Sequence, residues 1–324
     1  MILSMRPPYD ITSNILKYIS SISEKIGAAN TLFLDKQSPQ LRKQNKIKTI
    51  HSSLQIEGNT LSEEQITALV DNKRIIGPQK DITEVINAIA VYESLDSLKS
   101  VSEKSFLSAH GSLMKGLITQ PGKYRTSGVG VVKGSQVAHL APPAQNVPGL
   151  MKDLFNYLKN DQELALIKSC VFHYEMEFIH PFLDGNGRMG RLWQTIILKE
   201  RYSVFEFLPF ETLISQSQEE YYQALAASDK AGKSTVFIEY MLRIIDSSLE
   251  NMLKITGRTL TSDERISYFL TLGKNEFSRK DYMEVFKSLS SATASRDLKK
   301  AVEKKMFLAE GEGNQMRYSL NKTK

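Results

Sequence analysis

Apolar residues recur at three- and four-residue intervals along most of this chain, which is the spacing of amphipathic helices. The spacing predicts helices near residues 11–27, 40–57, 62–72, 82–99, 103–117, 149–158, 161–179, 187–202, 217–230 and 234–254. Patterns that favour strands stand out only within residues 124–144 and near the C-terminal end. The chain is therefore expected to be mainly α, with a small amount of β structure.

The strand-like stretch at residues 124–144 is rich in Gly, Val and Ser. Valines stand at 129, 131 and 132 before Gly134, and a second β-prone run follows from Val137 to Leu140. β-Branched residues on both sides of a glycine-containing turn predict a β-hairpin. Its exposed edge would suit pairing with an extended peptide, and an ordinary surface hairpin is the alternative.

The C-terminal part predicts a small separate domain after a boundary near residues 256–261. Helices are expected at residues 262–271, 278–286 and 291–302, followed by two strands around a turn at residues 311–314. This order is typical of a winged helix. From residue 259 onward, 13 Lys and Arg stand against 9 Asp and Glu, so most of the chain's net charge of +6 lies here. The excess is consistent with contact to DNA, and docking to a protein is the alternative.

Composition narrows the class of protein. Hydrophobic residues make up 41% of the 324 residues, and no run approaches the ~18 apolar residues that a membrane span needs. The N-terminus has no signal-peptide pattern, and the single cysteine, Cys170, cannot form an intramolecular disulfide. Cys170 lies in an apolar helical stretch and is expected to be buried. We therefore expect a cytoplasmic protein without membrane contact.

The segment richest in chemistry, residues 180–191, reads HPFLDGNGRMGR. Apolar periodicity resumes directly after it, so its glycine-flanked turn opens a helix, whose N-terminal N–H groups and dipole attract anions. Asp184 is the type of ligand that Mg²⁺ takes together with phosphate oxygens and water. Arg188 and Arg191 share a helix face and can reach outer phosphate oxygens. The segment predicts a nucleotide-phosphate site with His180 at its edge.

This segment resembles the signature of Fic-domain proteins, HPFxDGNGRxxR, and every fixed position is filled. The resemblance continues upstream and downstream, in residues 122–125, 129–143, 173–179 and 221–225. It implies a Fic helical core with the hairpin as its flap, within the second of three regions. These regions are an N-terminal helical region at 1–100, a catalytic core at 101–257 and the winged-helix-like domain at 258–324.

The resemblance also implies an activity, the transfer of AMP from ATP to a Ser, Thr or Tyr hydroxyl of a protein with release of pyrophosphate. His180 would be the general base on that hydroxyl, a task suited to a group that titrates near neutrality. Asp184 would hold the Mg²⁺ that bridges the α- and β-phosphates. Arg188 would balance charge on the pyrophosphate side, and Arg191 would hold the γ-phosphate.

Further contacts to the nucleotide are implied in the loop, the flap and the helix near residue 229. The loop backbone, with the amide of Asn186, would stabilise the phosphates. The residues assigned in this way are Gly185, Asn186, Gly187, Val132, Lys133 and Asp229. The flap would align the target protein, auto-modification is expected, and a homodimer is an open alternative.

A second short motif, Ser53-Leu54-Gln55-Ile56-Glu57-Gly58, resembles the inhibitory pattern [S/T]xxxE[G/N] of Fic proteins that carry their own inhibitory helix. Ser53 and Glu57 are four residues apart and share one helix face. The resemblance implies that Glu57 pairs with Arg191 and takes the place of the γ-phosphate. The chain is thus expected to be a self-inhibited adenylyltransferase.

Two other functions are compatible with the same residues. The site could remove AMP from a protein by hydrolysis, with Glu57 orienting water, or could use another nucleotide. The chain could also be a DNA-binding regulator that acts through residues 258–324. The intact signature argues against this last reading, because DNA binding does not require His180 and Asp184 together.

Overall fold

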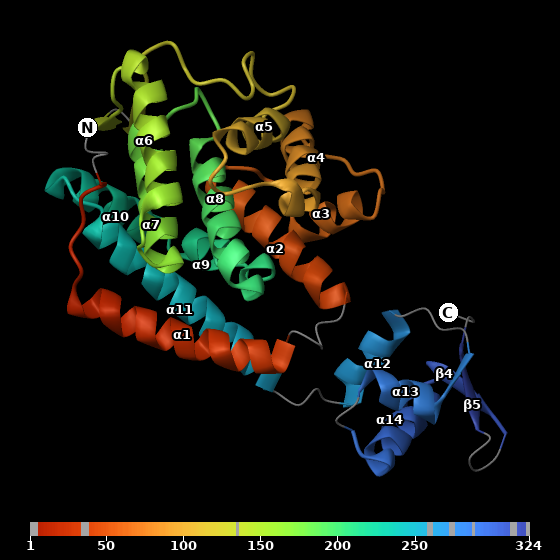
Figure 1. Ribbon diagram of the computed structural model, residues 1–324. Coiled ribbons are helices and arrows are strands. Elements are labelled where there is room, and N and C mark those ends of the chain that lie inside the picture. The colour runs from red at the N-terminus through yellow and green to blue at the C-terminus, as the bar shows by residue number, and fades with distance from the viewer. Residues whose placement is uncertain are drawn as a thin grey trace. The chain divides into compact units, whose positions relative to one another are not determined.

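The computed structural model describes residues 6–33, 39–133, 136–257, 262–271, 276–286, 289–311 and 316–321. The chain divides into two compact units, Met1–Ile255 and Thr256–Lys324, and each is described by itself. The mainly α prediction is confirmed (Figure 1). Within the described residues, no helix is both long and apolar enough to cross a membrane.

The first unit is built of helices and one hairpin. Its helices are α1 (Ser13–Phe33), α2 (Pro39–Ile56), α3 (Glu63–Val70), α4 (Gln79–Glu93), α5 (Glu103–Leu113), α6 (Val147–Asn160), α7 (Ala165–Ile179), α8 (Asn186–Arg201), α9 (Glu211–Gln216), α10 (Gln218–Ala231) and α11 (Thr235–Gly257). Short 3₁₀ turns lie at η1 (Leu95–Ser97), η2 (Ala144–Asn146) and η3 (Ser203–Glu206). The periodicity did not predict α9, because six residues are too few to show a helical repeat.

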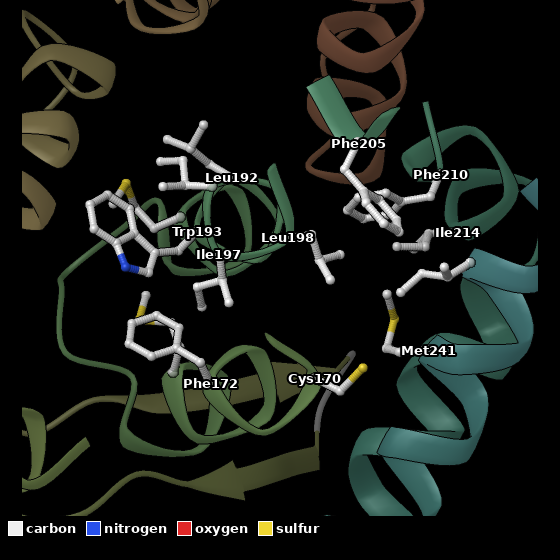
Figure 2. Close-up of a cluster of buried hydrophobic side chains, with 14 of the residues drawn as sticks. Cys170, Phe172, Leu192, Trp193, Ile197, Leu198, Phe205, Phe210, Ile214 and Met241 are labelled. Carbon is white, nitrogen blue, oxygen red and sulfur yellow. The ribbon is translucent and has the colours of Figure 1, made fainter. Parts of the chain in front are cut away.

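The core of the first unit is centred on α7 and α8, which pack against each other. Figure 2 shows part of it, with Phe172 and Cys170 from α7 near Trp193, Ile197 and other side chains of α8. Trp193 is fully buried and meets the ring of Phe106 edge-on, with centroids 5.0 Å apart. Cys170 is buried, as predicted. Gly190 lets the two helices approach, since a Cβ there would lie 2.6 Å from Cδ2 of His173 on α7.

The end of α2 is set by its own sequence. Gly58 has a φ of 89°, which a glycine adopts without strain, and the Asn59 N–H bonds back to the Leu54 carbonyl at 3.1 Å. Ser62 and Gln65 then form a capping box at the start of α3. These local signals fix where α2 stops, and therefore where Glu57 lies.

The predicted hairpin is present as β1 (Gly130–Lys133) and β2 (Gln136–Leu140). The strands are antiparallel, with an irregularity in register between Val131 and Val132. The turn residues 134–135, and all side chains from 130 to 140, lie outside what the structure describes, including those of Val132 and Lys133.

Within its described residues, the second unit contains three helices and a three-stranded sheet. Its elements in chain order are α12 (Ser262–Thr271), β3 (Glu276–Ser278), α13 (Arg279–Val285), α14 (Ser291–Glu303), β4 (Phe307–Glu310) and β5 (Arg317–Leu320). The sheet order is β3-β5-β4, and both pairings are antiparallel. A buried ion pair between Arg265 of α12 and Asp297 of α14, at 2.6 Å, lies in its interior. The predicted wing turn falls largely on residues 312–315, outside the described residues.

Candidate functional site

The site begins where α7 ends at Ile179 and the chain turns sharply into α8. His180 takes the left-handed conformation, with a φ of 49°, which costs a residue other than glycine on the order of 1–3 kcal/mol. Gly185, with a φ of 84°, makes the second turn and precedes the first residue of α8. Such strain persists only where the surroundings enforce it, and three side chains do so here.

The orientation of the His180 imidazole defines which nitrogen is basic. Its Nδ1 lies 3.4 Å from the carbonyl oxygen of Glu177. A carbonyl can only accept, so a neutral imidazole in this contact carries its proton on Nδ1. The lone pair is then on Nε2, and this nitrogen is the one that can take a proton from a substrate.

Arg125 is the first of the side chains that hold the loop. It is 2% exposed, and its guanidinium donates to the carbonyls of His180 at 2.7 Å and Ile179 at 3.2 Å. The same group donates to the carbonyls of Ser127 at 2.9 Å and Pro142 at 2.6 Å, which lie on either side of the hairpin. One buried cation therefore ties the strained residue to both ends of the flap.

His110 of α5 holds the other side of the loop. The Gly122 N–H donates to its Nδ1 at 2.9 Å, so the ring proton is on Nε2, which donates to the Asp184 carbonyl at 3.0 Å. The ring stacks on Phe182, with centroids 3.5 Å apart. Burial lowers the pKa of His110 to about 4, so the imidazole is neutral near pH 7.

Asn186 is the third side chain that holds the loop. Its Oδ1 accepts from the Phe182 N–H and its Nδ2 donates to the Phe182 carbonyl, both at 2.9 Å. The side chain is 2% exposed. These bonds use one of the two N–H donors and one of the two oxygen lone pairs of the amide, so the side chain closes the loop. Its contact with phosphate stays a prediction.

Asp184 and Arg188 lie at the open edge of the site. The Asp184 side chain is 47% exposed, and its Oδ1 accepts from the Gly185 N–H and from Arg188 at 3.1 Å. Arg188 is itself buried and pairs at 3.1 Å with Glu84, a buried residue of α4 that the sequence did not single out. Asn59, two residues after Glu57, donates to the other oxygen of Glu84 at 2.8 Å.

Arg191, unlike Arg188, bonds to the end of α2 and the residue that follows it. It donates to Ser53 Oγ at 3.1 Å, to the Ser53 carbonyl at 2.9 Å and to Glu57 at 2.7 Å. The Glu57 carboxylate lies against the first turn of α8, since a Cβ on Gly187 would be 2.4 Å from its Oε1. Arg191 Nη1 is buried without a hydrogen-bond partner among the described residues. The two predicted motifs therefore meet in space.

Asp229 is the implied nucleotide contact that lies outside the loop and the flap. Asp229 of α10 accepts from the Tyr174 hydroxyl at 2.8 Å, and burial together with the Asp229 charge raises the pKa of Glu175 to about 7. His173 is a fully buried core residue bonded to Gln194 and Tyr221, as its apolar helix predicts.

A metal would have few ligands from the protein alone. Among the described residues, no group of three or more His, Cys, Asp or Glu side chains forms a cage. A single half-exposed carboxylate, Asp184, beside a helix N-terminus fits Mg²⁺, which binds through one or two carboxylates together with substrate phosphates and water.

The sequence alone did not identify His110 and Arg125, which hold the loop, or Glu84, which pairs with Arg188. Arg125 stands in the recognised segment at 122–125, which was a usable signal. His110 and Glu84 lie in unremarkable helical stretches, and only the fold brings them to the loop.

Comparison with known proteins agrees with this geometry. The Fic/DOC family model matches residues 100–198. The chain is 29% identical over 224 residues to a probable protein adenylyltransferase of Aquifex aeolicus, and 27% identical over 232 residues to protein adenylyltransferase fic-1 of Caenorhabditis briggsae. Each match covers 66% of this chain, but only 65% and 43% of the relatives, so the chain spans less than two thirds of their length.

Solved structures extend the similarity over the chain. A Fic family protein from Desulfovibrio desulfuricans G20 is 39% identical, with a TM-score of 0.78 and coverage of 99% of both chains. Fic-1 of Caenorhabditis elegans is 21% identical with a TM-score of 0.63, covering 75% of this chain and 73% of the other, and shares the fold.

Proposed function

This chain belongs to the Fic/DOC family, and from that premise we propose that it is a self-inhibited protein adenylyltransferase, which moves AMP from ATP to a protein hydroxyl. The observation that supports it most is the loop between α7 and α8. There a histidine with a basic Nε2 lies beside a helix N-terminus, an exposed carboxylate and a buried arginine. Curated relatives named protein adenylyltransferase support the same activity.

In the proposed reaction, the hydroxyl oxygen of the target attacks the α-phosphorus of ATP while its proton passes to Nε2 of His180. The bond from the α-phosphorus to the bridging oxygen breaks, and pyrophosphate leaves with the electron pair. Backbone N–H groups at Gly187 and the start of α8 would stabilise the phosphate charge. Such transfer depends mainly on positioning and electrostatics, which is the part that the tied loop supplies.

Asp184 would hold Mg²⁺ when the nucleotide is bound, and the ion would neutralise charge on the phosphates. The bonds of Asp184 described above involve Oδ1, so its other carboxylate oxygen would be the one to hold the ion. Arg188 keeps its second partner, Glu84, and so remains placed beside the phosphates.

Self-inhibition is proposed from the ion pair between Glu57 and Arg191. The Glu57 carboxylate pairs with Arg191 and also fills the space next to Gly187. A terminal phosphate at Arg191 would have to displace it, so removal of Glu57 should activate the enzyme.

The test is incubation of the Glu57→Gly protein with ATP labelled at either the α- or the γ-phosphate. Stable incorporation of the α-label alone is expected. Incorporation of the γ-label alone would mean a kinase, and loss of AMP from a pre-modified protein would mean hydrolysis.

For the second unit we propose a winged helix, from its order of helices and strands and its three-stranded sheet. Its excess of basic residues supports nucleic acid as one ligand. A salt-sensitive mobility shift of duplex DNA by the full chain, lost in Arg296→Gln and Lys299→Gln on the exposed face of α14, would support DNA contact.

A further inference from the structure

A cavity of about 340 Å³ lies beside α2, nearer the start of this helix than Ser53 and Glu57 are. Its walls come from α2, α3, α4, η1, α8, η3 and the two residues after η3, all within the first unit. The volume is in the range of small-molecule sites in proteins. None of the residues assigned to the reaction lines it.

The walls of this cavity are largely apolar and aromatic. Ile89 and Leu95 line one side, and Phe205, Phe207 and Leu208 line the other. Apolar walls of this kind bind the apolar part of a ligand by burying its surface. A few polar groups then fix the orientation of the ligand. The polar groups of this cavity lie at its two ends.

The inner end carries a hydrogen-bond donor without an acceptor. The Tyr92 hydroxyl is buried and has no partner among the described residues. A buried hydroxyl left unpaired destabilises the protein, so a ligand that supplies an acceptor removes that penalty. Burial also raises the pKa of Tyr92 well above 10, so the hydroxyl keeps its proton and can donate.

The outer end carries an excess of positive charge on α2. Arg42 and Lys46 are four residues apart, hence adjacent on the helix, and the Arg42 guanidinium lies 4.8 Å from the centre of the Phe207 ring. The acidic lining residues Asp96 and Glu206 pair with Lys199, which leaves Glu93 as the other acid of the lining. A carboxylate, sulfonate or phosphate placed between Arg42 and Lys46 would complete the charge pattern.

We propose that this cavity is an effector site for a small amphipathic anion, with its charged group on Arg42 and Lys46, its apolar body between the aromatic walls and an acceptor atom at Tyr92. Such a ligand would contact α2 together with α4, α8 and the segment that follows α8, so a displacement of α2 would break part of its contacts. It therefore binds the docked position of α2 better than any displaced one, and binding favours the docked state by that difference.

The cavity reaches the inhibitory contact through two threonines. Thr49 and Thr195 line its inner part, and the Thr195 hydroxyl donates to the Arg191 carbonyl at 3.3 Å. Thr49 lies one turn before Ser53, which bonds Arg191 directly. An occupied cavity thus strengthens the hold of α2 on Arg191. This consequence rests on the proposed self-inhibition, whereas the binding site itself does not.

Binding is tested with 8-anilinonaphthalene-1-sulfonate, whose fluorescence rises in apolar sites, and with 4-phenylbutyrate as competitor. Lys46→Gln and Tyr92→Phe should each weaken the probe's affinity roughly fivefold, and Lys159→Gln, an exposed lysine of α6, should leave it unchanged. 4-Phenylbutyrate should displace the probe better than the uncharged 4-phenylbutanol. Equal affinity in all three variants, or equal displacement by acid and alcohol, would overturn the site.

Coupling is tested by hydrogen exchange of the full chain. The probe should slow exchange of the amides around residues 50–58 in the wild type and in Lys159→Gln, but not in Lys46→Gln at the same concentration. Unchanged exchange in the wild type, with binding established, overturns the link to α2. If Glu57→Gly incorporates no label from ATP, the proposed function fails while these two measurements keep their meaning.

Discussion

The catalytic loop at residues 180–187 and the end of α2 meet at Arg191, yet they are held in different ways. The loop is tied through its backbone by three buried polar side chains, Arg125, His110 and Asn186. The end of α2 reaches the site through Ser53, which accepts two bonds from Arg191, and through Glu57, whose side chain is 27% exposed and makes one ion pair. Backbone bonds to buried groups are expensive to break, and a partly exposed ion pair is not.

This difference separates a part that must keep its shape from a part that can be displaced. The loop carries backbone strain at His180, which only a fixed surrounding can maintain. The bonds described above from Arg125, His110 and Asn186 to the loop do not involve the inhibitory carboxylate of Glu57. Variants in the two regions should therefore differ in kind, with loss of structure or chemistry in one and gain of activity in the other.

The largest effect is expected from removal of the base. In the Glu57→Gly background, His180→Ala should lower the rate of AMP transfer by ~10²–10⁴-fold, because proton transfer from the hydroxyl is lost. ATP affinity by calorimetry and the melting temperature should stay near those of Glu57→Gly. Equal labelling by the single and double variants would remove His180 from the mechanism.

The second largest effect is expected from loss of the Arg125 guanidinium, which ties the loop to the flap. Arg125→Met should lower the free energy of unfolding by about 3 kcal/mol, because it leaves several buried carbonyls without a donor. Urea denaturation measures this, with the exposed Arg201→Met as the matched control at within ~0.5 kcal/mol of wild type. A loss below 1 kcal/mol would show that the loop does not depend on Arg125.

A smaller effect is expected in the pH dependence of the free energy of unfolding, to which His110 contributes. Its pKa is lowered to about 4 in the folded state from 6.5, so its contribution to stability is complete above about pH 6.5 and is lost as pH falls toward 4. His173, with its pKa lowered to about 3 by burial, acts in the same direction. Glu211 and Glu175, with pKa values raised to about 8 and about 7, act oppositely, so the wild-type profile alone does not isolate His110.

The variant His110→Gln isolates this contribution. Its destabilisation relative to wild type should be smaller at pH 5 than at pH 7 by roughly 2 kcal/mol, since each pKa unit is worth about 1.4 kcal/mol. Urea titrations at the two pH values give the comparison. The same destabilisation at both would mean that His110 is not held neutral in the folded protein.

The same comparison explains how much the sequence could predict. Helix periodicity, the capping box at Ser62 and the hairpin are local patterns, and the structure contains all three. The meeting of Glu57 with Arg191 was expected from a resemblance, because nothing in the spacing of two motifs 134 residues apart defines it. The roles of His110 and Glu84 required the fold, since each acts on the site through a contact more than 70 residues away in sequence.

Asn186 shows the limit of reading a motif one residue at a time. An amide beside a phosphate cradle suggests a ligand contact, but here one N–H and one lone pair of the amide already bond the Phe182 backbone. A side chain within a signature can support the loop that binds rather than bind by itself.

The central claim is that Glu57 pairs with Arg191 at the position that the γ-phosphate of ATP would take. Calorimetry of Mg²⁺-ATP and Mg²⁺-ADP with the wild type and with Glu57→Gly tests it directly, because ADP lacks that phosphate. The account predicts that the substitution tightens ATP about tenfold more than ADP, the amount expected from one charge-assisted contact. Equal changes for the two nucleotides, or none for either, would contradict it.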